Sequence, residues 1–384
     1  MVGGHSMSNS QTPRFEYSVG QLNQQATVLT DFDEFTDGFV PRFATKANPH
    51  SEIIKRFSNS GLHFDASSSY ETTLLLQQGI PGAHISLSSQ QPAHNLSELL
   101  DAGVLYVATS MHQLKLFLQE KNRPSTVGLR VNPGLGAGHN NRTTTGGANS
   151  SFGLWNTYVP DALELATQHD VTIDRLHVHI GSGADPNMWG SVMDTALELV
   201  DQLPDVTSLD IGGGFKIHRY GDEQEADMTD ILSVFAKKIA TYKKRTSRGL
   251  TLEIEPGTWL VAHAGTLIAD VVDIVDTGPD GHTFLRINTG MNDIIRPSMY
   301  GAQHRIEILN DSTEQKEYVV VGHNCETGDI LTTGIGDPES IAPRLLNKAA
   351  IGDEIAIYDA GAYCASFAAH GYNSFPDAQE VFVD

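Results

Sequence analysis

The chain has 384 residues, and its 25 basic and 47 acidic side chains give a formal net charge of −22. This charge argues against nucleic acid or an anionic membrane as a partner. The sequence has no apolar stretch long enough for a membrane span or a signal peptide. Two cysteines, Cys325 and Cys364, are too few for a disulfide framework, so we expect a reducing, cytoplasmic setting.

The first 30 residues form a polar N-terminal segment in which Phe15 and Tyr17 are modest strand signals. We interpret residues 1–6 as the remnant of an expression tag, ahead of a native start at Met7. The rest of this segment is expected to pack on a C-terminal β domain.

Residues 31–265 alternate between short strand-like runs and longer helix-like runs. The strand-like runs cover residues 43–45, 63–65, 85–87, 106–108, 127–131, 176–180, 208–211 and 251–254. The helix-like runs cover residues 51–59, 70–78, 93–102, 111–120, 189–203 and 229–245. This spacing is typical of parallel βαβ units, and about eight strands predict a closed (β/α)8 barrel of the TIM type.

Residues 266–384 have a different texture. Alternating runs at 267–275, 283–287, 318–322 and 354–358 have few helical stretches between them. We therefore predict a C-terminal antiparallel β domain. Within the barrel, residues 134–151 are rich in Gly, Asn and Thr, which indicates a long loop over the barrel mouth.

Several predicted barrel strands end in polar residues or glycine, namely Lys46, Asp65, His179, Gly212 and Glu255. In such barrels the C-terminal strand ends carry the chemistry. A lysine there, if desolvated, can form a Schiff base with an aldehyde, although a lone lysine is more often a surface residue.

Three glycines, Gly212, Gly213 and Gly214, directly follow a predicted strand. Their backbone N–H groups could cradle a phosphate, but a tight turn explains them equally well. His177 and His179 alternate on another strand and face the same side. They could form a metal pair, but no Cys or carboxylate lies at ligand spacing, so we expect no metal site. His179 could instead stack on an aromatic ring, with His177 in the core.

Glu255 precedes Pro256 and Gly257 at a predicted strand end. Its carboxylate could pair with a ring N–H⁺ and keep a pyridine protonated, which makes that ring an electron sink. Glu253 is an alternative for this role, and an exposed turn residue is the simpler explanation. In the second domain, Cys325 is a candidate acid or substrate contact. Arg296 suits the capture of a carboxylate.

An ordered series of motifs runs through almost the whole chain. These motifs are Phe-Ala-Thr-Lys-Ala-Asn, Phe-Asp-Ala-Ser, Arg-Val-Asn-Pro, Ser-Phe-Gly, His-Val-His-Ile-Gly-Ser, Asp-Ile-Gly-Gly-Gly-Phe, Glu-Pro-Gly, Arg-Pro-Ser-Met-Tyr-Gly, Cys-Glu-Thr-Gly-Asp and Gly-Ala-Tyr. In this order they resemble the pyridoxal-phosphate-dependent decarboxylases of fold type III, the alanine-racemase-like fold. Within that fold the resemblance is closest to the diaminopimelate decarboxylases.

The resemblance implies pyridoxal 5'-phosphate as cofactor and a role for each matched residue. Lys46 would bind the cofactor through a Schiff base, His179 would stack on its ring, and Glu255 would pair with the pyridine nitrogen. Cys325 would be the catalytic acid and would reach the site of a second subunit in a homodimer. The other cofactor-binding residues would be Asp65, Arg130, Ser182, Gly213, Gly214 and Tyr363. The substrate-binding residues would be Arg296, Tyr300, Glu326 and Tyr372.

The substrate implied by the resemblance is meso-diaminopimelate, which would be converted to L-lysine and CO2. One position departs from the family pattern, because Thr258 stands where Glu-Pro-Gly is usually followed by arginine. A decarboxylase of ornithine, lysine, arginine, or a polyamine or siderophore intermediate therefore stays open as an alternative. An amino-acid racemase or a non-catalytic cofactor-binding protein fits the motifs less well.

Overall fold

The computed structural model describes residues 11–134 and 146–384, in two compact units. The first, which we call the barrel unit, comprises Asn23–His218 and Glu223–Leu260. The second, the sheet unit, comprises the described residues up to Leu22, then Arg219–Asp222 and Val261–Asp384. The predicted tag remnant, residues 1–6, lies outside the described residues, as does most of the loop predicted over 134–151.

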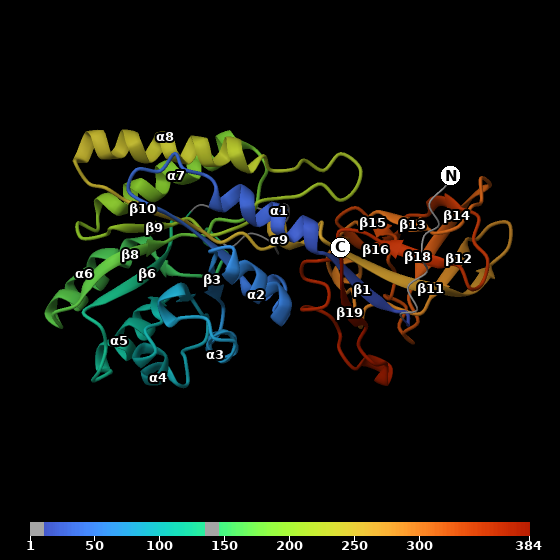
Figure 1. Ribbon diagram of the computed structural model, residues 1–384, viewed down its shortest axis with the longest axis horizontal. Helices are drawn as coiled ribbons and strands as arrows, with labels where there is room; N and C mark the ends of the chain where they lie inside the picture. Colours follow the sequence, from blue (N-terminus) through green and yellow to red (C-terminus); the bar gives the residue numbers. More distant parts are fainter. Residues whose placement is uncertain (1–10, 135–145) are drawn as a thin grey trace. The chain divides into compact units, whose positions relative to one another are not determined.

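The barrel unit contains a closed barrel of parallel strands (Figure 1). Along the chain, each barrel strand pairs with the next, for example Leu105–Ala108 with Thr126–Asn132, and the ring closes because the last strand, Thr251–Ile254, pairs with the first, Phe39–Ala44. The predicted (β/α)8 barrel is therefore confirmed. Its strands are β2 (Phe39–Ala44), β3 (His63–Ala66), β4 (Ile85–Leu87), β5 (Leu105–Ala108), β6 (Thr126–Asn132), β8 (Thr172–His177), β9 (Ser208–Asp210) and β10 (Thr251–Ile254), and the short β7 (Leu154–Trp155) pairs with β6.

Helices connect these strands, and several begin at a side chain that caps them. Ser68 accepts a hydrogen bond from the backbone N–H of Glu71, and Asp227 accepts one from Asp230, which satisfies donors that a helix start leaves open. Inside the barrel wall, Phe43 packs edge-on against Phe57 of α2. The helices are α2 (Ser51–Asn59), α3 (Ser69–Gln77), α4 (Leu96–Asp101), α5 (Met111–Gln119), α6 (Val159–Gln168), α7 (Pro186–Asp201) and α8 (Met228–Thr246).

The sheet unit is built on a mainly antiparallel sheet, as predicted, although β12–β14 and β1–β19 pair in parallel. Its strands are β1 (Arg14–Ser18), β11 (Gly265–Asp276), β12 (Thr283–Ile287), β13 (Ile306–Ile308), β14 (Gln315–Val321), β17 (Arg344–Asn347), β18 (Glu354–Ile357) and β19 (Gln379–Val383). A separate small hairpin joins β15 (Thr333–Gly334) to β16 (Asp337–Ile341), and α10 (Arg296–Tyr300) is the helix of this unit.

Two helices lie across the boundaries between the units, which run through α1 (Val19–Thr30) and α9 (Thr258–Val261). Strand β1 pairs with β11 and β19 of the sheet unit, whereas the rest of the N-terminal segment after Leu22 belongs to the barrel unit. In the described part of the chain, no helix has both the length and the apolar character needed to cross a membrane.

Candidate active site

The predicted site residues of the barrel unit gather at the C-terminal edge of the barrel. Asp65 lies in β3, and Lys46 lies in a 3-10 turn directly after β2. His179 and Gly212 follow β8 and β9, and Glu255 directly follows β10. Because all barrel strands are parallel, these positions share one end of the barrel.

Lys46 is accessible and paired with a buried acid. Its Nζ lies 3.3 Å from Oδ2 of Asp65 and donates to Oγ of Ser67 at 3.1 Å. The lysine side chain is 43% exposed and that of Asp65 only 1%. The lysine is therefore exposed to solvent, whereas the sequence suggested a desolvated lysine at this position. It is an amine that a ligand can reach, with a fixed carboxylate beside it.

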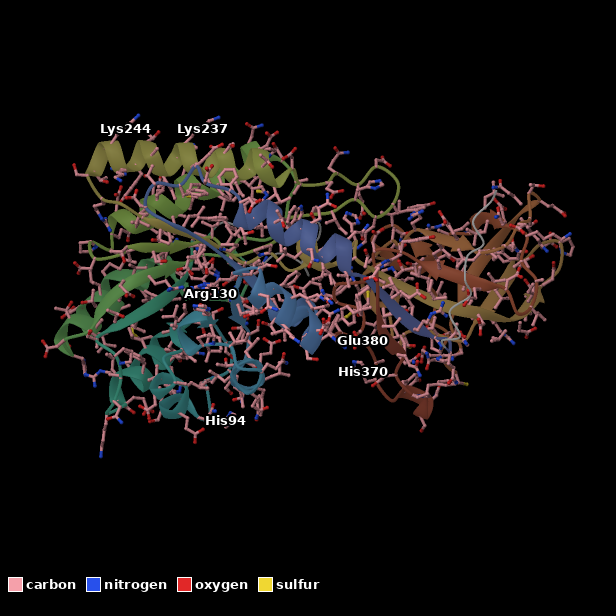
Figure 2. The ribbon with its side chains drawn as sticks, viewed as in Figure 1. His94, Arg130, Lys237, Lys244, His370 and Glu380 are labelled. Atoms are coloured by element: carbon pink, nitrogen blue, oxygen red, sulfur yellow. The ribbon has the colours of Figure 1, made fainter. Side chains whose placement is uncertain are left out.

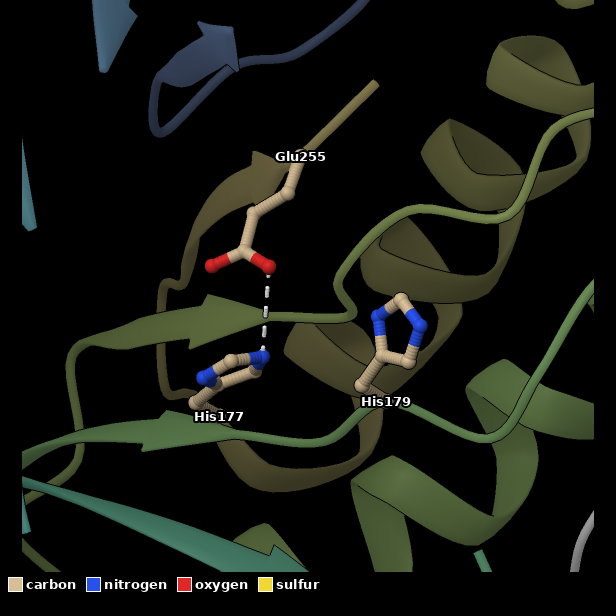
Figure 3. A group of neighbouring side chains, drawn as sticks. All are labelled: His177, His179 and Glu255. Atoms are coloured by element: carbon tan, nitrogen blue, oxygen red, sulfur yellow. Dashed lines mark ion pairs between the residues drawn. The ribbon is translucent and has the colours of Figure 1, made fainter. Parts of the chain in front are cut away.

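Glu255 is a buried carboxylate with an unmet hydrogen-bonding oxygen. Its Oε2 lies 3.5 Å from Nε2 of His177, and Figure 3 shows the two side chains facing each other. Its Oε1 is buried without a hydrogen-bond partner among the described residues. Burial, with the charges of Asp210 and Asp65, raises the pKa of Glu255 well above its usual value, against the effect of Lys46 and Arg130. Such an acceptor fits the N–H⁺ of a pyridine ring.

His179 is fixed by the glycine turn after β9. The backbone N–H of Gly213 donates to Nδ1 of His179 at 3.0 Å, so that nitrogen is unprotonated. A Cβ on Gly212 would lie 2.2 Å from the same Nδ1, so the close approach requires glycine. Burial, with the charges of Arg130 and Lys46, keeps the pKa of His179 well below its usual range. His179 is thus a neutral, anchored ring suited to stacking.

One backbone N–H of the glycine turn remains a candidate for binding a phosphate. The amide of Gly213 is already committed to His179, which leaves Gly214 as the candidate donor of the turn. Gly214 has a φ of +107°, and a Cβ there would lie 1.9 Å from the carbonyl oxygen of Gly181. Ser182 follows Gly181 in the facing loop, and the strand-like contact between Gly183 and Phe215 holds the two loops together.

Arg130, labelled in Figure 2, projects from β6 with its guanidinium 5.0 Å from the ring of Phe152. Burial lowers the pKa of Arg130, and the charges of Glu255, Asp65 and Asp210 act in the opposite direction. Arg130 is therefore a cation set among the acids of the barrel end.

The fold brings a carboxylate to the two histidines, which the sequence did not show. Donor atoms of His177, His179 and Glu255 all lie within 4.8 Å of one another (Figure 3). We assign no ion here, because His179 is oriented by the glycine turn and Oε1 of Glu255 is left for a donor. One flat protonated ring, stacked on the imidazole and bonded at its edge, accounts for both features.

A buried cluster of charged side chains, Glu253 with Arg42 and Arg175, lies in the barrel and was not expected from the sequence. Glu253 is buried, and its Oε2 lies 2.5 Å from both Nε of Arg42 and Nη1 of Arg175. Ser208 donates to its other oxygen. Glu253 is therefore already paired within the protein and does not fit the alternative role of pairing with the ring, and the exposed turn residue considered for Glu255 is wrong, because Glu255 is buried. The available signal was the alternation of Glu253 with Glu255 and the two arginines, Arg42 and Arg175, that directly precede predicted strands.

In the sheet unit, two loops that carry predicted site residues meet. The backbone N–H of Cys325 donates to Oδ1 of Asn373 at 2.6 Å, and the Tyr372 hydroxyl lies 3.4 Å from Oε2 of Glu326. Cys325 and Glu326 are exposed. Cys325, Glu326 and Tyr372 therefore lie close together, on two loops joined by these contacts.

The remaining predicted residues of this unit lie on α10 and near the C-terminus. Arg296 and Tyr300 are four residues apart on α10, and Nη1 of Arg296 is buried with no hydrogen-bond partner in residues 11–134 and 146–384. The Tyr300 ring stacks on Phe367 at 6.3 Å. Tyr363 has a φ of +54°, an uncommon backbone conformation for tyrosine. An unpaired, buried guanidinium nitrogen is suited to a carboxylate ligand.

Comparison with known proteins agrees with this geometry. Residues 22–262 match the pyridoxal-binding domain of pyridoxal-dependent decarboxylases. A diaminopimelate decarboxylase of Streptomyces coelicolor is 31% identical over 97% of this chain and 84% of its own. A crystal structure of a diaminopimelate decarboxylase matches with a TM-score of 0.89 and 30% identity, covering 97% of this chain and 89% of its own. The Helicobacter pylori diaminopimelate decarboxylase complexed with L-lysine matches with a TM-score of 0.84 and 26% identity, over 98% and 92% of the two chains.

Proposed function

We propose that this chain, which belongs to the pyridoxal-dependent decarboxylases, converts meso-diaminopimelate into L-lysine and CO2. The enzyme is a carboxy-lyase with pyridoxal phosphate as cofactor. The proposal for the substrate is supported by nearly full-length similarity to several diaminopimelate decarboxylases, including one complexed with L-lysine. The observation that carries the chemistry is the buried Oε1 of Glu255, which lacks a partner among the described residues.

The residues of the barrel end fit the cofactor. Lys46 supplies the amine for its aldehyde, His179 the stacking surface, and Glu255 the acceptor for its ring nitrogen. Bound there, pyridoxal phosphate draws the electrons released by decarboxylation into its protonated ring. The Gly214 turn and Ser182 offer groups for the phosphate, and Tyr363 is a further proposed phosphate ligand. Arg130 and Asp65 help to position the cofactor ring.

Residues of the sheet unit recognise the substrate and complete the reaction. Arg296 and Tyr300 bind the distal carboxylate, and the buried, unpartnered Nη1 of Arg296 supports this role. Glu326 and Tyr372, joined at 3.4 Å, contact the substrate's polar groups. The Cys325 thiol delivers a proton to the carbon that has lost CO2.

The enzyme acts, on this proposal, as a homodimer in the cytoplasm, with Cys325 and Glu326 serving the site of the partner chain. Both residues are exposed and lie on loops joined by the Cys325–Asn373 hydrogen bond. Mixing Lys46→Ala chains with Cys325→Ala chains should then restore part of the activity, because one site per heterodimer keeps both groups. Proven heterodimers with no recovered activity would refute shared sites.

A substrate panel tests the function directly. CO2 release and product identity are measured with meso-diaminopimelate, ornithine, lysine and arginine, with Lys46→Ala as the control that removes the cofactor's attachment. We expect release from meso-diaminopimelate, with L-lysine as product, and none from Lys46→Ala. Since Thr258 replaces a cationic side chain, preferred turnover of a substrate without a second carboxylate is the alternative, and it would refute this substrate assignment.

A further inference from the structure

The two oxygens of the Glu255 carboxylate have different surroundings. Oε2 lies 3.5 Å from Nε2 of His177, whereas Oε1 is buried and meets no hydrogen-bonding group of the described residues. The His177 and Glu255 side chains are only 1% and 3% exposed. A shift of a few tenths of an ångström would turn the 3.5 Å contact into a hydrogen bond. The carboxylate is thus turned with one oxygen to the protein and the other to the ligand.

The buried position of His177 is energetically unfavourable for a polar side chain. Neither of its ring nitrogens has a hydrogen-bond partner within the described residues, and a buried unsatisfied polar group destabilises the fold. Its neighbours in sequence, Leu176 and Val178, are apolar and buried, so packing alone would be served by an apolar side chain. Among the described residues, the polar group that lies beside the His177 ring is the Glu255 carboxylate.

We infer that His177 is a positioning residue, whose Nε2–H holds Oε2 of Glu255 and so directs Oε1 at the ring nitrogen of the cofactor. This inference rests on the proposed function only for the identity of the cofactor, which the family supplies. It assigns to His177 no contact with substrate or cofactor.

A neutral donor suits this task better than a cation. Burial and the charges of Arg130, His179, Lys46 and Arg175 hold the pKa of His177 well below its usual range, so the imidazole stays uncharged. An uncharged N–H orients the carboxylate without neutralising it, and the negative charge stays available for a ring N–H⁺. An arginine in place of His177 would form an ion pair with Glu255 and compete with the cofactor ring for its negative charge. Arg42 and Arg175 form such ion pairs with Glu253.

The test reads the protonation of the ring nitrogen itself. The holoenzyme is prepared with pyridoxal phosphate labelled with ¹⁵N in the ring, without amino-acid substrate, and its ¹⁵N NMR signal is recorded. We expect a protonated ring in the wild type and in His177→Gln, whose amide N–H can reach Oε2. We expect loss of the protonated-ring signal in His177→Leu. His63→Leu is the control, because His63 is a part-buried histidine of a different barrel strand, stacked on His84 at 4.0 Å, and its replacement should leave the signal unchanged.

Two further variants keep the result decisive. Glu255→Gln gives the reference signal of an unprotonated ring, because its amide cannot keep the ring nitrogen protonated. If His177→Leu does not fold, His177→Asn replaces it, since its amide is one methylene too short to reach Oε2.

A folded His177→Leu or His177→Asn enzyme with a fully protonated ring would overturn the positioning role. A wild-type protein that binds no pyridoxal phosphate would refute the proposed function as well. Binding without the expected loss would refute the positioning role alone.

Discussion

Glu253 and Glu255 stand two residues apart at the end of one strand, face the same side, and have opposite surroundings. Glu253 has two arginines and a serine hydroxyl as partners. Glu255 has one neutral histidine, and one of its oxygens finds no partner in the described residues. Burial raises the pKa of both. Arg42 and Arg175 reverse that rise for Glu253, whereas for Glu255 the charges of Asp210 and Asp65 add to it.

This difference separates structure from function within one barrel. A buried carboxylate that already has its counter-ions can only stabilise the fold, because no charge is left for a ligand. A buried carboxylate with unmet hydrogen-bonding capacity is a cost that a ligand can remove. The deeper layer of the barrel thus has its charges paired, whereas the layer at the strand ends keeps a carboxylate oxygen without a partner among the described residues, which is where we propose that the cofactor binds.

The largest expected effect is on stability, from Glu253→Gln. Removal of this charge leaves Arg42 and Arg175 buried without a counter-ion, which should lower the free energy of unfolding by about 3–5 kcal/mol. Chemical denaturation measures this loss, and Glu255→Gln is the matched control. An unchanged unfolding free energy would mean that Glu253 is not the structural member of the pair.

Next in size is the effect of Glu255→Gln on turnover. The amide cannot keep the ring nitrogen protonated, so we expect kcat to fall about 100-fold, or about 2.7 kcal/mol in the activation barrier. Absorbance should show that the cofactor stays bound, since Lys46 still holds it. Wild-type turnover in this variant would assign the pairing to another residue and remove the contrast with Glu253.

The fold was more predictable than this contrast. Alternating strand-like and helix-like runs predicted the barrel, and the glycines and Glu255 do lie just after barrel strands, as expected. The α1 helix, Val19–Thr30, was missed because half of its residues are polar, although Ser18 caps its start by accepting the Gln21 N–H at 3.3 Å. The contacts of Glu253 with Arg42 and of Glu255 with His177 join distant parts of the chain. Local patterns carry no information about such pairs, since only barrel closure brings them together.

The two carboxylates should also give opposite pH dependences of stability in the cofactor-free protein. The lowered pKa of Glu253 contributes stability above pH 4.5, its ordinary value, which is lost as the pH falls. The raised pKa of Glu255 contributes stability below pH 4.5, which is lost as the pH rises through the folded-state pKa.

Denaturation curves between pH 3 and 9, a range of about six units that extends below and above the ordinary value of 4.5, measure both slopes. Glu255→Gln should gain stability over the wild type as the pH rises, and the deficit of Glu253→Gln should shrink as the pH falls. Slopes of the same sign in the two variants would contradict the assignment.

The smallest expected effect comes from Asp210, which links the two layers. Burial and the charge of Glu253 raise the pKa of Asp210 to about 6, and its own charge raises that of Glu255. Asp210→Asn keeps an acceptor for the Gly212 N–H, so we expect kcat to change less than about 10-fold. The pH profile of kcat should lose its inflection near pH 6. A profile identical to the wild type would place Asp210 outside the electrostatics of the site.

The pairing of β1 with β11 and β19 has a consequence for how the chain is made. Arg14–Ser18 leaves the ribosome before the other described strands, yet its parallel partner, Gln379–Val383, leaves after them. All eight barrel strands are available before either partner of β1 is complete. During synthesis the barrel can therefore close while the edges of β1 are still unpaired, and an exposed unpaired strand can bind wrong partners. The synthesis of β19 then completes the pairing of β1.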